Sequence, residues 1–396
     1  MIRIANIIKL TGLYTINSSF ITLLSIIYFI SGFQSLSIEI SILHSCIAFF
    51  TFSLSSYSKN LIVIDKSMYK IFNDYNFRFR ISIVVLIFIL LILICFKIEN
   101  FFILFFISII LLFQWLFELI IAKSEINNDY RFINFNFVFF SFFLFILLTL
   151  FFLELYDYYI HMIIFFSIYI SIYVAKNALI IIFLKDGIKK KLLLLLKDYS
   201  IISSSALPLA NLIWKILIVF LYGKIFSASL FFIFTLCSFV STLYNNSLGY
   251  SLLRKHSNFN LLLITIYLFL IVLIIFNYDF IMNFIPKEIE ILIDDRIFFK
   301  KTIIYSFIGS FFMLVGQYLR SLSLYSNIHK RAVIFKSDIV YSFALIFYCL
   351  IIIFFKKIED LQYLFLLGGI SNFIIYFFLG YYLNKKKNII TSTIKL

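Results

Sequence analysis

The chain has 396 residues, of which 63% are hydrophobic and only 13% are charged, and its mean hydropathy is +1.08. Soluble domains carry about 25% charged residues, so this composition excludes a soluble globular protein. Apolar runs of near 20 residues recur from end to end, the length that a helix needs to cross roughly 30 Å of hydrocarbon. The runs lack the alternation of membrane β-strands. We therefore predict an all-α integral membrane protein.

Twelve transmembrane helices are predicted along the chain. The two prolines and ten glycines interrupt few of the apolar runs. Most connections are short, so that neighbouring helices form antiparallel hairpins. Residues 61–80, before the third span, are equally consistent with an amphipathic interfacial helix and with a solvated loop. The predicted spans are residues 8–30, 38–58, 81–96, 101–122, 132–153, 159–184, 199–221, 226–252, 259–276, 302–322, 338–355 and 361–383.

A basic stretch at the centre of the chain, residues 185–198, separates the sixth and seventh spans. We interpret it as a bridge between an N-terminal six-helix lobe, residues 1–187, and a C-terminal six-helix lobe, residues 188–396. A trace of internal repetition agrees, because Gly32 lies 14 residues before Cys46 and Gly223 lies 14 residues before Cys237. Six spans in each half give both halves the same orientation, which predicts a parallel repeat about an axis along the membrane normal, surrounding a central cavity.

The positive-inside rule sets the orientation of the spans. With the N-terminus in the cytoplasm, 24 of the 34 lysines and arginines lie in cytoplasmic segments and eight lie outside. We therefore predict that both termini are cytoplasmic. The formal net charge of +15 is then mainly an orientation signal and a contact with anionic membrane lipids, and it does not indicate a nucleic-acid partner.

Two lysines fall inside predicted spans. Lys176 lies eight residues from the cytoplasmic end of the sixth span, and Lys215 lies seven residues from the outer end of the seventh. At 1.5 Å per residue these depths are roughly 10 to 12 Å, and a cation so deep is a candidate for function. No carboxylate is predicted at a comparable depth. We predict that one or both lysines line a cavity that receives anionic groups, the alternative being snorkelled or interhelical lysines.

Three further polar residues are candidates for the cavity. Asn17 and Asn211 lie on the polar faces of the first and seventh spans, and each amide offers two donors and an acceptor. Arg320, near the end of the tenth span, is interpreted either as a gate or as an ordinary interface anchor. Pro208 removes a helix hydrogen bond and predicts a kink in the seventh span.

Motifs for catalysis, cofactors and metals are missing from the sequence. It contains no P-loop, no dinucleotide fingerprint, no His/Glu metal motif and no nucleophile elbow. We therefore predict no catalytic residues, no cofactor and no metal, and a protein that is not an enzyme. Any driving force for transport would come from an ion gradient or from the gradient of the substrate.

In this layout the chain resembles the polysaccharide flippases (Wzx type) of the multidrug/oligosaccharidyl-lipid/polysaccharide exporter superfamily. Local similarities lie in residues 12–60, in Ala206-Leu-Pro-Leu-Ala210, in Gly316-Gln-Tyr-Leu-Arg320 and in Phe335-Lys-Ser-Asp338. The resemblance implies movement of an undecaprenyl-diphosphate-linked sugar unit to the outer leaflet of the bacterial inner membrane, for O-antigen and lipopolysaccharide synthesis. It also implies a cationic cavity, which Lys176 and Lys215 match in type and depth, and other polysaccharide-assembly membrane proteins as partners.

Two alternative functions stay open. A drug or cation antiporter of the same superfamily is expected to carry a buried carboxylate in its first half. We predict none there, since Glu118 lies only about four residues from the end of its predicted span. A polysaccharide polymerase or another membrane glycosyltransferase is expected to carry a long outer loop with catalytic residues. Residues 277–301 are short for such a loop.

Overall fold

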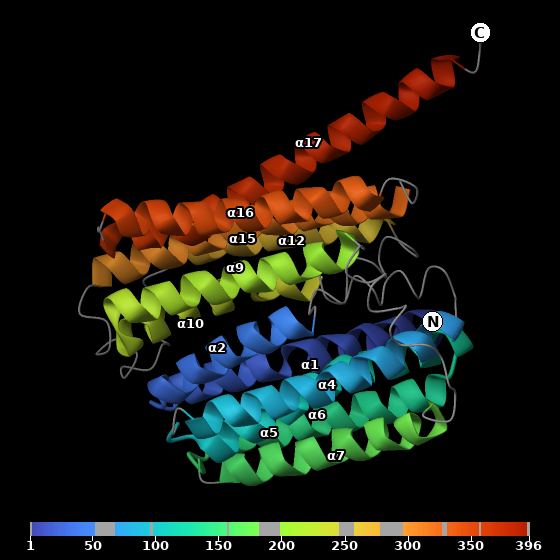
Figure 1. The fold of residues 1–396 in the computed structure, drawn as a ribbon. Coiled ribbons are helices and arrows are strands. Elements are labelled where there is room, and N and C mark those ends of the chain that lie inside the picture. The colour runs from blue at the N-terminus through green and yellow to red at the C-terminus, as the bar shows by residue number, and fades with distance from the viewer. Residues whose placement is uncertain are drawn as a thin grey trace. The chain divides into compact units, whose positions relative to one another are not determined.

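The computed structural model describes residues 2–51, 68–95, 98–156, 158–181, 199–244, 257–277, 296–326, 331–355 and 358–393. These residues contain twelve α-helices and one 3-10 helix (Figure 1). The elements are α1 (Ile2–Ile30), α2 (Gln34–Phe50), α4 (Met68–Cys95), α5 (Phe101–Asn127), α6 (Tyr130–Phe152), α7 (Tyr158–Ile181), α9 (Tyr199–Tyr222), α10 (Lys224–Leu243), α12 (Ser257–Phe276), α15 (Arg296–Ser326), α16 (Arg331–Phe355), η4 (Ile358–Tyr363) and α17 (Leu364–Thr393).

Each of the twelve predicted spans overlaps one of these helices in its described residues, which confirms the all-α fold. Ten of the helices in the described ranges are long and apolar enough to cross a membrane, and α2 and the apolar part of α12 are shorter. The chain is a multi-pass membrane protein. Several boundaries differ from the prediction: α4 begins at Met68, inside the segment whose structure was left open, and α15 runs from Arg296 to Ser326. The predicted bridge, residues 185–198, lies outside the described residues.

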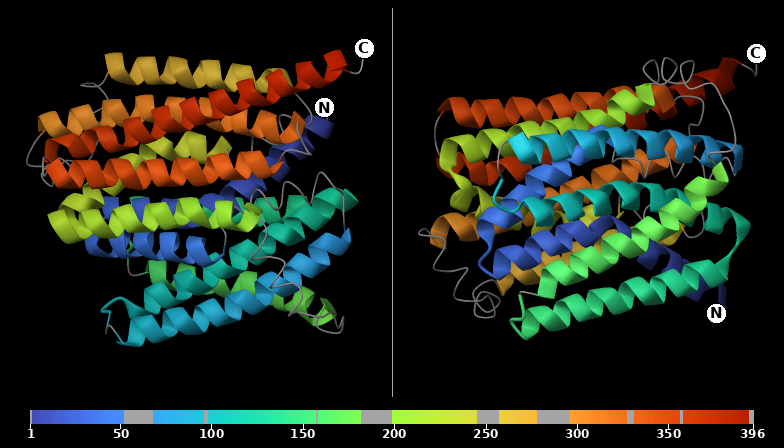
Figure 2. Two further views of the ribbon diagram at one scale, coloured as in Figure 1. Left: turned by 45° about the horizontal axis from the view of Figure 1, so that its top comes forward. Right: turned by 60° about the horizontal axis from the view of Figure 1, so that its bottom comes forward.

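The chain divides into two compact units, an N-terminal unit of Met1–Ile216 and a C-terminal unit of Leu217–Leu396. In the first unit α5 is central and contacts α1, α2, α4, α6 and α7. In the second unit α15 is central and contacts α10, α12, α16, α17 and η4, the helices of each unit running alongside one another (Figure 2). Along the described residues the central helices are thus the fourth and the tenth of the twelve α-helices. The lobe boundary at residues 187 and 188 stays a prediction.

The two glycines of the predicted repeat occupy equivalent turns. Gly32 has a φ of 85° between α1 and α2, and Gly223 has a φ of 81° between α9 and α10. A side chain with a Cβ atom rarely adopts this left-handed region, so glycine suits both turns. The first helical hairpin of each half therefore turns in the same way, which agrees with the internal repetition seen in the sequence.

One face of α6 illustrates how the apolar surface is used. Phe135, Val138, Phe142 and Phe145 are each more than half exposed, and their spacing of three and four residues places them on one side of the helix. In water such a continuous apolar face would drive aggregation. On a membrane protein it is the surface that lipid chains cover, while Ile133, Asn136 and Phe140 pack inside the N-terminal unit.

Two glycines allow α15 and α17 to approach closely inside the C-terminal unit. A Cβ atom added to Gly369 of α17 would lie 2.6 Å from the carbonyl carbon of Gly309 and 2.8 Å from its Cα atom. A Cβ atom added to Gly309 would lie 2.8 Å from the Cα atom of Leu366. Because these neighbours are backbone atoms, they cannot move aside as a flexible side chain would, and small residues are required at this contact.

We expect Gly369→Ala to destabilise the C-terminal unit. Overpacking of a tight contact costs about 1–3 kcal/mol, and here the added methyl group meets backbone. The measurement is the midpoint of thermal unfolding of the full chain in detergent. Gly380→Ala, on the same helix, is the matched control, because its Cβ atom would lie 3.9 Å from the Ser323 hydroxyl. Equal midpoints for the two variants would contradict the close contact.

Candidate functional site

Lys215 is held in place by α2, entirely within the N-terminal unit. Its ammonium nitrogen donates to the Ser41 carbonyl oxygen at 3.1 Å, to the Ser41 hydroxyl at 2.8 Å and to the Ser45 hydroxyl at 2.9 Å. The three acceptors are uncharged oxygens, so these bonds orient the ammonium without cancelling its positive charge. Lys215 lies in the span of α9 that covers Ser205–Tyr222, and its function stays a prediction.

The two serines come from a regular pattern on α2. Ser37, Ser41 and Ser45 recur every four residues, which places them along one face of the helix. Ser37 turns to α1, where its hydroxyl donates to the Ser25 carbonyl oxygen at 2.8 Å. The Ser45 hydroxyl donates to the Ser41 carbonyl oxygen at 3.1 Å, one turn earlier. Sequence reasoning missed Ser41 and Ser45, although their spacing was visible.

Two of the other predicted residues lie on α7 and α9. Asn211 precedes Lys215 by one turn on α9, and its amide oxygen accepts a hydrogen bond from the Trp214 indole nitrogen at 3.0 Å. Lys176 is exposed on α7. Asn211 thus shares a helix and a face with Lys215, whereas Lys176 is on another helix, and its place in a cavity stays a prediction. Pro208 is buried within α9.

Asn17 lies at the contact between α1 and α5. It is 5% exposed, and its amide nitrogen donates to the Gln114 carbonyl oxygen at 3.2 Å. In the described part of the chain its amide oxygen and the Gln114 amide nitrogen are both buried without a hydrogen-bond partner. A buried unsatisfied polar group costs about 1–3 kcal/mol, so a water molecule or a polar ligand group at these atoms would be stabilising.

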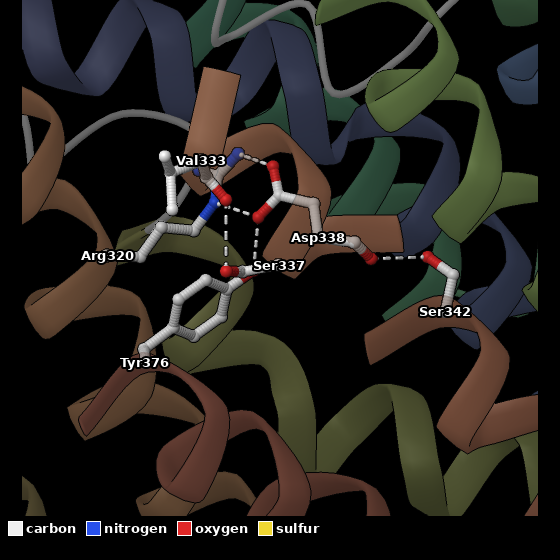
Figure 3. Close-up of polar contacts among 6 residues, drawn as sticks. All are labelled: Arg320, Val333, Ser337, Asp338, Ser342 and Tyr376. Carbon is white, nitrogen blue, oxygen red and sulfur yellow. Dashed lines mark hydrogen bonds and ion pairs between the residues drawn. The ribbon is translucent and has the colours of Figure 1, made fainter. Parts of the chain in front are cut away.

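Arg320 forms a buried ion pair in the C-terminal unit (Figure 3). Its guanidinium donates to both carboxylate oxygens of Asp338 on α16, at 2.9 and 2.8 Å, and the Tyr376 hydroxyl of α17 donates to the same carboxylate. The two charged side chains are 8% and 4% exposed. The sequence had placed Arg320 near the end of its span, but α15 continues to Ser326. The pair therefore joins three helices inside the unit.

A second ion pair, in the N-terminal unit, was missed by the sequence analysis. Arg78 of α4 lies 3.3 Å from the Glu118 carboxylate of α5, donates to the Trp115 carbonyl oxygen at 2.8 Å, and lies 4.9 Å from the centre of the Trp115 ring. The Glu118 side chain is only 14% exposed. The statement that the first half has no buried carboxylate was therefore wrong. It failed because Arg78 was placed outside the third span and Glu118 near a helix end, whereas α4 begins at Met68 and α5 ends at Asn127.

Histidine, cysteine and acidic residues do not gather into a metal-binding group anywhere in the part of the chain that the structure describes. The four cysteines are free, with Cys237 and Cys349 buried and Cys95 exposed. The polar features that could act on a ligand are the Lys215 ammonium with its serines, Asn211 on the same helix, the exposed Lys176, and the buried amides of Asn17 and Gln114.

Comparison with known proteins gives a likeness of fold. No family model matches the sequence, and no curated protein matches it. Among solved structures, a MATE in the straight conformation has a TM-score of 0.54 at 13% identity and covers 99% of this chain and 97% of its own. An outward-facing multidrug resistance MATE family transporter of the MOP superfamily has a TM-score of 0.54 at 11% identity, with coverage of 99% and 96%. A MATE in complex with MaD5 has a TM-score of 0.55 at 12% identity, with coverage of 99% and 97%. The chain thus has the fold of MATE-type transporters of the MOP superfamily.

Proposed function

We propose that this protein is a flippase, which moves an undecaprenyl-diphosphate-linked oligosaccharide from the cytoplasmic to the outer leaflet of the bacterial inner membrane for surface polysaccharide synthesis. The observation that carries the proposal is the Lys215 ammonium, held by Ser41 and Ser45 within an apolar span. A fixed cation at such a place suits an anionic headgroup better than a cationic drug. The whole-chain likeness to MATE-type folds supports a transporter.

The physical mechanism is alternating access, in which six-helix lobes rock about a site near the bilayer midplane. The polyprenyl tail stays in the lipid while the diphosphate and the sugar cross in a cavity. Lys215 and Lys176 meet the diphosphate through charge-assisted hydrogen bonds, and Asn211 and Asn17 supply neutral donors and acceptors. No covalent bond is made or broken, so the protein is proposed not to be an enzyme. Both termini lie in the cytoplasm, and other polysaccharide-assembly membrane proteins are the proposed partners.

The fate of the lipid-linked sugar in cells that lack the gene tests this function. We expect single-unit precursor to accumulate on the cytoplasmic side, with no unit reaching the surface, because the headgroup cannot cross unaided. The measurement is extraction and mass analysis of the lipid-linked sugars, together with the surface polysaccharide. Surface lipid that carries single unpolymerised units would show instead that the unit had crossed, and the protein would be a polymerase.

A drug or cation antiporter is the second candidate, and the Glu118 carboxylate of α5 favours it. A largely buried carboxylate in the first half is what such an antiporter was expected to have, and one of the structures with a similar fold is described as a multidrug resistance transporter. Glu118, however, is paired with Arg78, which neutralises it in this structure. Cells without the gene that become sensitive to cationic drugs while their surface polysaccharide stays intact would favour the antiporter.

A further inference from the structure

The N–H groups of the Lys215 ammonium are all engaged in hydrogen bonds. An ammonium group has three donors, and the described residues offer it three acceptors, namely both oxygens of Ser41 and the hydroxyl of Ser45. A phosphate oxygen can therefore bond to the ammonium only if it replaces one of these acceptors. The site in this structure is matched internally, and binding of an anion requires an exchange of partners.

The Ser41 carbonyl oxygen is the acceptor that is exchanged most easily. It makes the longest of the three bonds, 3.1 Å, and it also accepts the Ser45 hydroxyl at 3.1 Å. Within α2 the same carbonyl faces the backbone N–H of residue 45, since helical bonds join residues four apart. A carbonyl oxygen has two lone pairs, so three donors are more than it can serve well. Loss of the Lys215 bond leaves this oxygen satisfied.

The hydroxyls of Ser41 and Ser45 differ in what their protons do. The Ser45 hydroxyl is buried, and its proton is directed to the Ser41 carbonyl oxygen. The Ser41 hydroxyl is half-buried and accepts a hydrogen bond from Lys215 at 2.8 Å, and within the described ranges it donates no hydrogen bond of its own. A hydroxyl that accepts from a cation has its own proton made more acidic and turned away from that cation. The proton of Ser41 is thus available to a ligand beside Lys215.

We propose that Ser41 is a second direct donor to the diphosphate, beside Lys215. On binding, Lys215 transfers one of its hydrogen bonds from the Ser41 carbonyl oxygen to a phosphate oxygen, and the Ser41 hydroxyl donates to the same diphosphate. Ser45 is a positioning residue. Its hydroxyl accepts from Lys215 and donates to the Ser41 carbonyl oxygen, which holds the two groups together, and it does not contact the ligand. The proposal rests on the proposed function, since it assumes that Lys215 meets an anion.

The test measures binding of farnesyl diphosphate to the full chain in nanodiscs of phosphatidylcholine, by isothermal titration at neutral pH. Inorganic pyrophosphate and farnesol are the parallel probes, the first without a lipid tail and the second without the anion. A hydrogen bond to a charged group contributes about 1.5–3 kcal/mol, so Ser41→Ala is expected to weaken binding of farnesyl diphosphate about tenfold. Ser41→Thr keeps the hydroxyl and should bind within about twofold of the native chain by the same argument.

Ser45→Ala is the matched control, because it removes the same hydroxyl one turn away. It removes one support of the Lys215 ammonium but no contact with the ligand, so binding should weaken less than in Ser41→Ala. If Ser45→Ala weakens binding as much as Ser41→Ala does, the assignment of the two roles is wrong.

If Ser41→Ala binds normally while Lys215→Met does not, Ser41 does not bind the ligand, but the anion site at Lys215 stands. If Lys215→Met binds normally, or farnesol binds as tightly as the diphosphate, the proposed function itself loses its site. Pyrophosphate that binds as tightly as farnesyl diphosphate would identify a free anion as the ligand.

Discussion

Lys215→Met is expected to abolish transport while leaving the protein folded and at its normal level in the membrane. Methionine has nearly the same length as lysine and suits an apolar span, so the helix loses a charge and little packing. The Ser41 and Ser45 hydroxyls that accept from Lys215 can then bond to carbonyl oxygens one turn earlier on α2, as Ser45 already does. The effect should therefore fall on the ligand and not on stability.

The size of the loss follows from the interaction that is removed. A charge-assisted hydrogen bond to a phosphate contributes about 1.5–3 kcal/mol, which corresponds to roughly a tenfold to hundredfold loss of affinity. The measurement is the amount of surface polysaccharide, and of accumulated precursor, in cells that express the variant in place of the native gene. Lys215→Arg keeps the charge but not the compact threefold donor geometry, and it should restore transport only in part.

Lys301→Met serves as the control for a change in net charge. Lys301 is exposed near the start of α15, and its replacement removes one positive charge outside the candidate site. It should transport normally. Normal transport by Lys215→Met, or an equal loss in both variants, would contradict a specific role for Lys215. Lys176→Met tests the second lysine. If Lys176 also lines the cavity, as predicted, this variant should lose transport as well.

The fold could be predicted from the sequence because hydrocarbon imposes a length and an apolar composition on every span. The boundaries failed where charged residues lie inside helices. Arg78 lies before the predicted third span, yet it is part of α4, where Glu118 and Trp115 compensate its charge. A partner 40 positions away on another helix leaves no trace in the local pattern, so hydropathy placed this arginine outside the span.

The candidate site, too, could be predicted only in part. Lys215 stood out because a lysine deep in an apolar run is costly, but its partners Ser41 and Ser45 lie 174 and 170 residues earlier in the chain. Serine is common in membrane helices and carries little signal alone. The spacing of four that joins Ser37, Ser41 and Ser45 indicates a shared face, but not which helix that face meets. That information exists only once the helices are packed.

Removing one partner of the Arg320–Asp338 pair is expected to destabilise the C-terminal unit strongly. Asp338→Asn leaves a buried guanidinium without its counter-ion, and breaking a buried pair in this way costs about 3–5 kcal/mol. Arg320→Met removes the cation that donates to both oxygens of the Asp338 carboxylate, although the Tyr376 hydroxyl still donates to it. Both variants should show reduced levels in the membrane and a lower midpoint of thermal unfolding in detergent. Lys336→Met, at an exposed site two residues before Asp338, should unfold like the native chain.

The double variant Arg320→Met with Asp338→Leu separates the two interpretations of Arg320 that the sequence left open. Replacing both members of a buried ion pair by apolar residues of similar volume is often neutral or stabilising, so the double variant should recover the stability that each single change loses. If Arg320 is an anchor that joins α15, α16 and α17, transport recovers with stability. If Arg320 is a gate that must exchange Asp338 for another partner, a stable double variant still fails to transport. Recovery of neither stability nor transport would contradict the compensation between the two charges on which both interpretations depend.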